Sequence, residues 1–159
     1  TGIIEQERVC CRFLRFQLTA EHGTGAIVFD VTGPSGTREM LRALSRASRA
    51  IRRLSIPTIA RVQGAAIGGG CGLMVVCDFA VTHAEAKLGY PEVDLGICPA
   101  VVAPWLIKKI GAGRARAMLL AGGTMTGQQG FDAGLATHLC PLAELDAIVA
   151  QSSRMPFEP

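Results

Sequence analysis

Short apolar runs alternate along the chain with glycine-containing turns and with longer segments of helical periodicity. Apolar runs of strand length occupy residues 26–29, 58–62, 79–82, 87–89 and 136–139. Residues 9–18 alternate only in part, and we interpret them as one further strand. Helical segments are expected over residues 38–54, 71–77, 101–110, 115–120, 126–134 and 142–150. Strands and helices in alternation predict an α/β fold with mostly parallel strand pairing.

Residues 71–77 form the most hydrophobic of the predicted helices and follow three consecutive glycines, Gly68, Gly69 and Gly70. Glycine lacks a Cβ, so a ligand can approach the backbone of such a turn closely. The first N–H groups of a helix have no partner within the helix and lie at the positive end of its dipole. The turn therefore suits a negative oxygen, of either a phosphate or a reacting carbonyl group.

The residues around these glycines do not match the common phosphate-binding motifs. The turn does not supply G-x-G-x-x-G, and Leu73 and Met74 stand where a P-loop would need lysine and serine or threonine. Close packing of a helix against a strand is the alternative explanation of the glycines. Because the following helix is almost wholly apolar, a buried slot for a carbonyl group is favoured over a solvated polyphosphate site.

A carboxylate follows the predicted strand 87–89, within the sequence Tyr90-Pro91-Glu92-Val93. Apolar surroundings disfavour the charged form of such a group and move its pKa toward the range useful for proton transfer. One glutamate alone is more often a surface charge or a helix cap. An oxyanion donor and a carboxylate are useful only together. The donor makes an α proton acidic, and the carboxylate transfers that proton.

Composition favours one domain over residues 1–159, because 49% of the chain is hydrophobic and only 18% is charged. The six cysteines include no C-x-x-C pair, and four of them lie in apolar runs. We therefore expect reduced thiols rather than disulfides or a zinc site. The sequence contains no recognisable signal peptide or membrane span, which predicts a cytoplasmic protein.

The net charge of +3 is concentrated in one predicted helix, which carries Arg38, Arg42, Arg46, Arg49 and Arg53. A solvated helix face is the simplest interpretation, and a surface for the phosphates of a cofactor or a nucleic acid is the alternative. Aromatic residues do not interleave these arginines, so nucleic-acid binding is not favoured. His83 and Glu85 lack a third potential ligand, and no metal site is predicted.

Several linked motifs resemble the central signature of the crotonase (enoyl-CoA hydratase/isomerase) superfamily. They are the stretch 56–70 with its G-A-A-I-G-G-G ending, Cys77-Asp78, and the stretch 86–96 with G-Y-P-E-V-D-L-G, followed by Pro99. The similarity continues through Gly111 and residues 120–136 and covers roughly residues 55–150. The resemblance implies a crotonase-like spiral of ββα units. This sequence is expected to lack part of its N-terminal region and its C-terminal helical region.

The resemblance also implies a coenzyme A thioester as substrate, with no bound cofactor and no metal. It assigns Glu92 as the catalytic acid/base and the Gly69 N–H as one of two oxyanion donors. The expected substrate- and coenzyme-A-binding residues are Ala65, Ala66, Gly68, Gly72 and Pro91. The expected reaction is reversible hydration or dehydration of an enoyl-CoA. An isomerase or decarboxylase on the same scaffold, and a non-catalytic binding protein, are the alternatives. The expected assembly is a homotrimer or a hexamer.

The chain departs from the family pattern at Gly72, where a second glutamate is typical. Its absence leaves Glu92 as the one expected acid/base and is expected to leave room beside the β carbon of the acyl group. Pro99-Ala100, followed by Pro104-Trp105, resembles methylglutaconyl-CoA hydratases and also the related dehydratases of polyketide β-branching. A branched 3-methylglutaconyl-type substrate is therefore the finer hypothesis. The family loop that supplies the first oxyanion N–H is not recognisable near residues 32–36.

Overall fold

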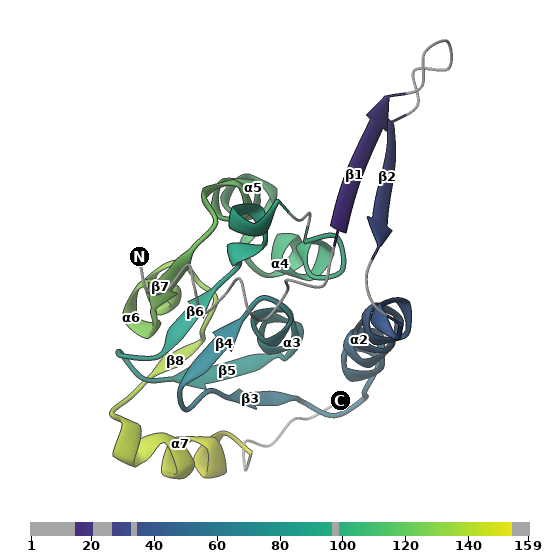
Figure 1. The fold of residues 1–159 in the computed structure, drawn as a ribbon. Coiled ribbons are helices and arrows are strands. Elements are labelled where there is room, and N and C mark those ends of the chain that lie inside the picture. Colours follow the sequence, from purple (N-terminus) through teal and green to yellow (C-terminus); the bar gives the residue numbers. More distant parts are fainter. Residues whose placement is uncertain (1–14, 21–26, 33–34, 97–98, 154–159) are drawn as a thin grey trace.

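The strands of the computed structural model, which describes residues 15–20, 27–32, 35–96 and 99–153, form three small sheets (Figure 1). The first is the antiparallel hairpin β1 (Arg15–Ala20) and β2 (Ile27–Thr32). The second is parallel, in the order β3 (Ile59–Arg61), β5 (Phe79–Thr82) and β8 (His138–Leu139). In the third, β4 (Ala65–Ile67) pairs in parallel with β6 (Lys87–Gly89), which pairs antiparallel with β7 (Thr124–Thr126).

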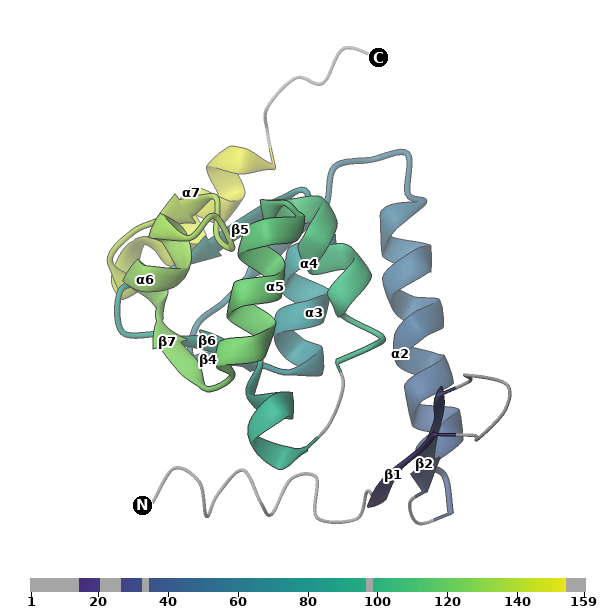
Figure 2. The same ribbon diagram turned by 90° about the horizontal axis from the view of Figure 1, so that it is seen from above.

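Six α-helices and two short 3-10 helices complete the described part of the chain. They are α2 (Thr37–Arg52), α3 (Gly69–Val76), η1 (Pro91–Leu95), α4 (Ala103–Ile110), α5 (Ala112–Ala121), α6 (Gly127–Asp132), η2 (Leu142–Glu144) and α7 (Leu145–Ser152). Helix α3 is central: it packs against β4, α2 and α4 (Figures 1 and 2). The hairpin β1–β2 lies beyond the end of α2 and projects away from the other sheets (Figure 1). No helix in the described ranges is long and apolar enough to cross a membrane.

The hydrophobic core forms around α3, as its sequence predicts. Cys71, Met74, Val75 and Val76 of this short helix are almost fully buried. They meet buried side chains from β6, α4 and the segment after α6, among them Leu88, Leu106 and Leu135. Burying one large aliphatic side chain stabilises a fold by about 1.5–3 kcal/mol. The glycine turn therefore leads directly into a largely buried helix of the core.

Most of the elements predicted from periodicity are confirmed. Strands β5 and β6 have the expected bounds, and α3 begins at Gly69, within the glycine run. Thr126 caps α6 through a reciprocal pair of hydrogen bonds with Gln129, of 3.2 and 2.9 Å. The expectation of a buried strand at residues 26–29 concerns β2, whose side chains lie outside the described part of the chain.

Two strands, β4 and β7, and the short helix η1 were not predicted from the sequence. Each of the two strands has three residues, too few to show a hydrophobic period. Since β7 pairs antiparallel with β6, the third sheet is mixed rather than parallel. The segment expected as one helix at 142–150 is divided into η2 and α7.

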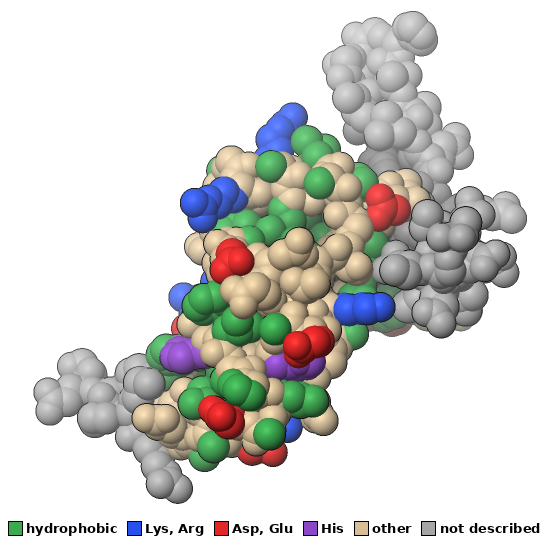
Figure 3. Space-filling model, turned by 90° about the vertical axis from the view of Figure 1, so that its left-hand side faces the viewer, with side chains coloured by type: hydrophobic (Ala, Val, Ile, Leu, Met, Phe, Trp, Pro, Cys, Tyr) green, Lys and Arg blue, Asp and Glu red, His purple; other side chains and the backbone are tan. Residues whose placement is uncertain are grey.

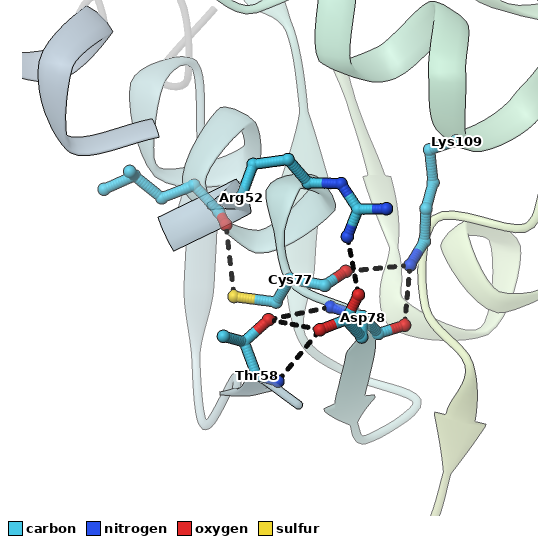
Figure 4. Close-up of polar contacts among 6 residues, drawn as sticks. Arg52, Thr58, Cys77, Asp78 and Lys109 are labelled. Atoms are coloured by element: carbon cyan, nitrogen blue, oxygen red, sulfur yellow. Dashed lines mark hydrogen bonds and ion pairs between the residues drawn. The ribbon is translucent and has the colours of Figure 1, made fainter. Parts of the chain in front are cut away.

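The C-terminal end of α3 is fastened by a polar cluster around Asp78 (Figure 4). The Asp78 carboxylate accepts hydrogen bonds from the Thr58 N–H and hydroxyl, both 2.9 Å, and from Arg52 at 2.6 Å. Lys109 donates to the carbonyl oxygens of Cys77 and Asp78, at 3.1 and 3.2 Å, where the helix dipole is negative. The cluster joins α2, β3, α3 and α4, so the Cys77-Asp78 motif has a structural role.

Candidate functional site

The glycine turn connects β4 to α3 in a conformation that requires glycine. Gly68 has φ 56° and ψ −119°, in the left-handed half of backbone space that residues with a Cβ rarely occupy. Its N–H donates to the Gly89 carbonyl (2.9 Å), and its own carbonyl accepts the Gly72 N–H (2.9 Å). The latter bond closes the first turn of α3. The N–H groups of Gly69 and Gly70 come before that bond, at the start of the helix, where no intrahelical acceptor is available.

Glu92 lies against Gly68 of this turn. A Cβ placed on Gly68 would lie only 3.3 Å from Glu92 Oε1 and 3.7 Å from the carboxyl carbon. The side chain of Glu92 is partly buried, and Oε2 is shielded from solvent. A Cβ at Gly68 would crowd the carboxylate, so glycine at this position leaves room for Glu92 at the N-terminus of α3. The Glu92 carboxylate therefore lies close to the end of α3 that carries its first N–H groups.

The 3-10 helix η1 that carries Glu92 is held on both sides. On one side, Tyr90 is 1% exposed and Pro91 is buried, so the entry to η1 is fixed in the core. On the other, the Asp94 carboxylate accepts a hydrogen bond from the Gly123 N–H, with a donor–acceptor distance of 2.7 Å. Asp94 therefore fastens η1 to the turn between α5 and β7, and its position affects where Glu92 lies.

Two buried groups, Cys71 and Tyr90, are influenced by the charge of Glu92. Burial raises the pKa of the Cys71 thiol to about 11, and the charge of Glu92 adds to this rise. Burial also raises the pKa of the Tyr90 hydroxyl, with further contributions from Cys71 and Glu92. Both groups therefore stay protonated at neutral pH, and Cys71 is not available as a thiolate nucleophile. The influence of Glu92 on both groups places its charge near them.

The room expected beside Gly72 does not exist. A Cβ on Gly72 would lie 2.2 Å from Val102 Cγ1 and 2.9 Å from Val102 Cβ. Gly72 is buried, and Val102 is 3% exposed. The expectation was wrong because it considered the space left by the missing glutamate side chain but not the Val102 side chain that fills this space. The sequence carried a weak signal in Val101-Val102, two apolar residues before α4.

A cavity of about 470 Å³ lies between α2, β3 and one side of α3. Ala65 and Ala66, two of the predicted substrate-binding residues, line it together with Gly70 of the glycine turn. Gly68, Gly72, Pro91 and Glu92 are not among the residues that line this cavity. The predicted site residues thus divide into a group at the start of α3 and a group along the cavity, and Gly70 belongs to the turn that joins them.

His83 has a structural environment rather than that of a metal ligand. It is 6% exposed, its Nε2 lies 2.6 Å from the Gln63 carbonyl oxygen, and its Nδ1 lies 3.0 Å from Glu85 Oε2. Both ring nitrogens therefore have partners in the protein. Within the described ranges, no group of three or more His, Cys, Asp or Glu side chains could hold a metal ion.

The fold and the glycine turn together define a crotonase-type α/β protein. Residues 34–154 match the family model described as enoyl-CoA hydratase/isomerase, which is well over half of the chain, and the chain belongs to that family. The structure is similar to the crystal structure of an enoyl-CoA hydratase from Bacillus anthracis, with a TM-score of 0.72 and 27% identity. That similarity covers 77% of this chain and 48% of the solved one.

Two curated relatives show the range of substrates named in the family. A 2,3-dehydroadipyl-CoA hydratase from Escherichia coli is 41% identical over 86 residues, which are 54% of this chain and 34% of the relative. A crotonyl-CoA hydratase from Syntrophomonas wolfei is 36% identical over 98 residues, 61% of this chain and 38% of the relative. The chain therefore spans about a third of the length of the curated relatives that it matches.

Proposed function

We propose that this chain forms the catalytic core of an acyl-CoA lyase that reversibly hydrates an enoyl-CoA thioester. Glu92 is the acid/base, and the Gly69 N–H is one of the donors to the thioester oxygen. The observation that carries the proposal is the contact of the Glu92 carboxylate with the glycine turn, 3.3 Å from where a Gly68 Cβ would be. A thioester bound at the start of α3 would meet both groups at once.

In the proposed hydration, one carboxylate serves both proton transfers. Glu92 accepts a proton from water as the water oxygen bonds to the β carbon, and the double-bond electrons move toward the thioester oxygen. The Gly69 N–H stabilises the enolate oxygen, and loss of one such donor typically costs about 2.7–4 kcal/mol of barrier. Glu92 then delivers the same proton to the α carbon. Dehydration follows the reverse path.

An isomerase is the second candidate, and one observation favours it. Val102 occupies the space over Gly72, so the described residues place Glu92, and no second carboxylate, at this turn. A double-bond shift moves one proton from one carbon to another and needs a single acid/base. A decarboxylase on the same scaffold would use the same oxyanion donor.

The finer proposal is a branched substrate of the 3-methylglutaconyl type. Its support is the Pro99-Ala100 and Pro104-Trp105 pattern, because no open space at Gly72 supports it. The 2,3-dehydroadipyl-CoA named for one relative is likewise a dicarboxylic acyl thioester. A methyl branch on the β carbon would be compatible with an apolar side chain such as Val102.

Replacement of Glu92 by Gln tests the proposal, because it keeps the size of the side chain and removes the base. We expect crotonyl-CoA hydration by the intact protein, followed as loss of enoyl absorbance, to fall by about 10²–10⁴ in kcat. The melting temperature should stay close to that of the wild type. Glu144→Gln, an exposed carboxylate in η2, is the matched control. Full hydratase activity in Glu92→Gln would refute the assignment.

A further inference from the structure

Val102 takes no part in the proton transfers proposed for Glu92, but it packs against the same helix. It immediately precedes α4, is 3% exposed, and lies so close to Gly72 that a Cβ there would be 2.2 Å from its Cγ1. Its isopropyl group therefore stands where a side chain of residue 72 would project. A side chain at position 72 of α3 would occupy space that is filled by the residue preceding α4.

This contact lies one helical turn from the contact made by Glu92. Glu92 meets Gly68, Val102 meets Gly72, and the hydrogen bond from the Gly72 N–H to the Gly68 carbonyl spans the turn between them. One turn is about 5.4 Å of helix axis. The Cα–Cβ bonds of a helix tilt toward its N-terminus, so a group in front of Gly72 leans toward Gly69. Val102 and Glu92 thus approach the same first turn of α3.

The backbone of Val102 is held by hydrogen bonds on both sides. The Val102 N–H donates to the Pro99 carbonyl (3.1 Å), and its own carbonyl accepts the N–H groups of Trp105 and Leu106, each at 3.1 Å. Leu106, one turn further on, is fully buried. A valine has few rotamers in such surroundings, and it cannot move aside without disturbing the start of α4.

We propose that Val102 is the specificity-determining residue of the acyl-CoA site. Its isopropyl group forms the apolar wall beside Glu92 and sets the size of the substituent that the reacting carbons can carry. This inference rests on the proposed function. A polar or charged substituent against the wall would lose its hydration without a partner, so the wall selects hydrogen or a compact hydrocarbon group. One methylene in an apolar pocket changes specificity by about 10–200-fold.

The test compares butyryl-CoA with isovaleryl-CoA, which carries one additional methyl group on the β carbon. Their dissociation constants are measured by calorimetry on the intact protein, on Val102→Ala and on Val102→Ile, so that no turnover is needed. Relative to the wild type, preference for isovaleryl-CoA should rise about tenfold in the alanine variant and fall about tenfold in the isoleucine variant. Val81→Ala, which truncates a fully buried valine of β5, should leave the ratio unchanged.

The inference would be overturned if the ratio of the two dissociation constants stayed within twofold of the wild-type ratio in both Val102 variants. If the isoleucine variant does not fold, the alanine variant alone decides. Glu92→Gln measured in parallel separates this inference from the proposed function. If Glu92→Gln loses turnover but the Val102 variants keep the wild-type ratio of dissociation constants, the proposed function holds and the role of Val102 is refuted. If Glu92→Gln retains turnover but the ratio shifts in the Val102 variants, the catalytic role of Glu92 is refuted and the role of Val102 in binding holds. Failure of both acyl-CoA thioesters to bind the wild type would overturn both.

Discussion

At the scale of single residues, the proposed site includes two glycines against which side chains from other elements pack. Gly68 admits the carboxylate of Glu92, and Gly72 admits the isopropyl group of Val102. The sequence motifs already named Gly68 and Glu92 together, because both residues lie within the recognised family signature. The motifs could not show the contact with Val102, since residues 30 positions apart meet only through the packing of α4 on α3.

The contact between Gly72 and Val102 makes a direct prediction for stability. Gly72→Ala should destabilise the fold by about 1–3 kcal/mol through overpacking, although alanine ordinarily favours a helix. Gly113→Ala in α5, where a Cβ meets nothing within 4 Å, should instead be neutral or stabilising by up to about 1 kcal/mol. Chemical denaturation measures both.

A double-mutant cycle with Val102→Ala provides the control for this prediction. The double variant should be more stable than the sum of the two single changes implies, because the truncated side chain makes room for the new methyl group. Effects of Gly72→Ala and Val102→Ala that add within about 0.5 kcal/mol would contradict the contact.

At the scale of elements, the short helix η1 is positioned by a polar contact rather than by its own helix propensity. Helix η1 has five residues, and Asp94 fastens it to Gly123. The predicted periodicities located α3, β5 and β6, because these elements are strongly apolar. They missed β4 and β7, because three residues carry too little pattern. The register between such elements arises from long-range pairing that a local pattern does not contain.

Asp94 should therefore act as a positioning residue for Glu92. Asp94→Ala removes the acceptor for the Gly123 N–H, and we expect kcat for crotonyl-CoA to fall about 10–100-fold through misplacement of the carboxylate. Asp94→Asn retains an acceptor oxygen and should recover most of the activity. KM should change less than kcat in both variants. An alanine variant with wild-type kcat would show that η1 is held without Asp94.

The cluster around Asp78 predicts a dependence of stability on pH. Partial burial alone would raise the Asp78 pKa, but hydrogen bonds from Thr58 and Arg52 outweigh it, and the pKa is lowered. A lowered pKa stabilises the fold above the ordinary aspartate value near 4, and the contribution is lost as the pH falls below it. Because the Arg52–Asp78 ion pair is exposed, we expect Asp78→Asn to lower the free energy of unfolding by only about 1 kcal/mol at pH 7.

Urea denaturation at several pH values measures this effect. The difference in unfolding free energy between the wild type and Asp78→Asn should shrink as the pH falls below about 4. The control variant is Asp132→Asn, because the Asp132 carboxylate accepts a hydrogen bond from Gln128 of the same helix. It should show a smaller difference at neutral pH. A difference for Asp78→Asn that is constant down to pH 2 would contradict the role of its charge.

At the scale of the whole molecule, one face remains rich in apolar side chains. Figure 3 shows hydrophobic groups gathered on it among charges of both signs, with a hollow in its upper half. A pocket of about 460 Å³ between α5, β7 and α6 is lined mainly by apolar residues, including Met118 and Met125. Leu120 is 62% exposed and Phe131 is 38% exposed. Such exposed apolar surface is typical of an interaction site.

We therefore expect self-association of the protein, as a trimer or a dimer of trimers. Burial of Leu120 and Phe131 between subunits would remove apolar area from water. Sedimentation velocity at micromolar concentration should show a trimer or hexamer, and Leu120→Glu should shift the distribution toward smaller species. A monomer in the wild type at that concentration would contradict the expectation.

The most direct test of the central claim is exchange of the α proton of butyryl-CoA with solvent deuterium, followed by NMR. This measurement requires only an oxyanion donor and one base, so it applies equally to a hydratase and an isomerase. The wild type and Glu144→Gln should incorporate deuterium at the α carbon, whereas Glu92→Gln should be slower by about 10²–10⁴. Exchange at the wild-type rate in Glu92→Gln would show that Glu92, although it lies at the glycine turn, does not move the proton.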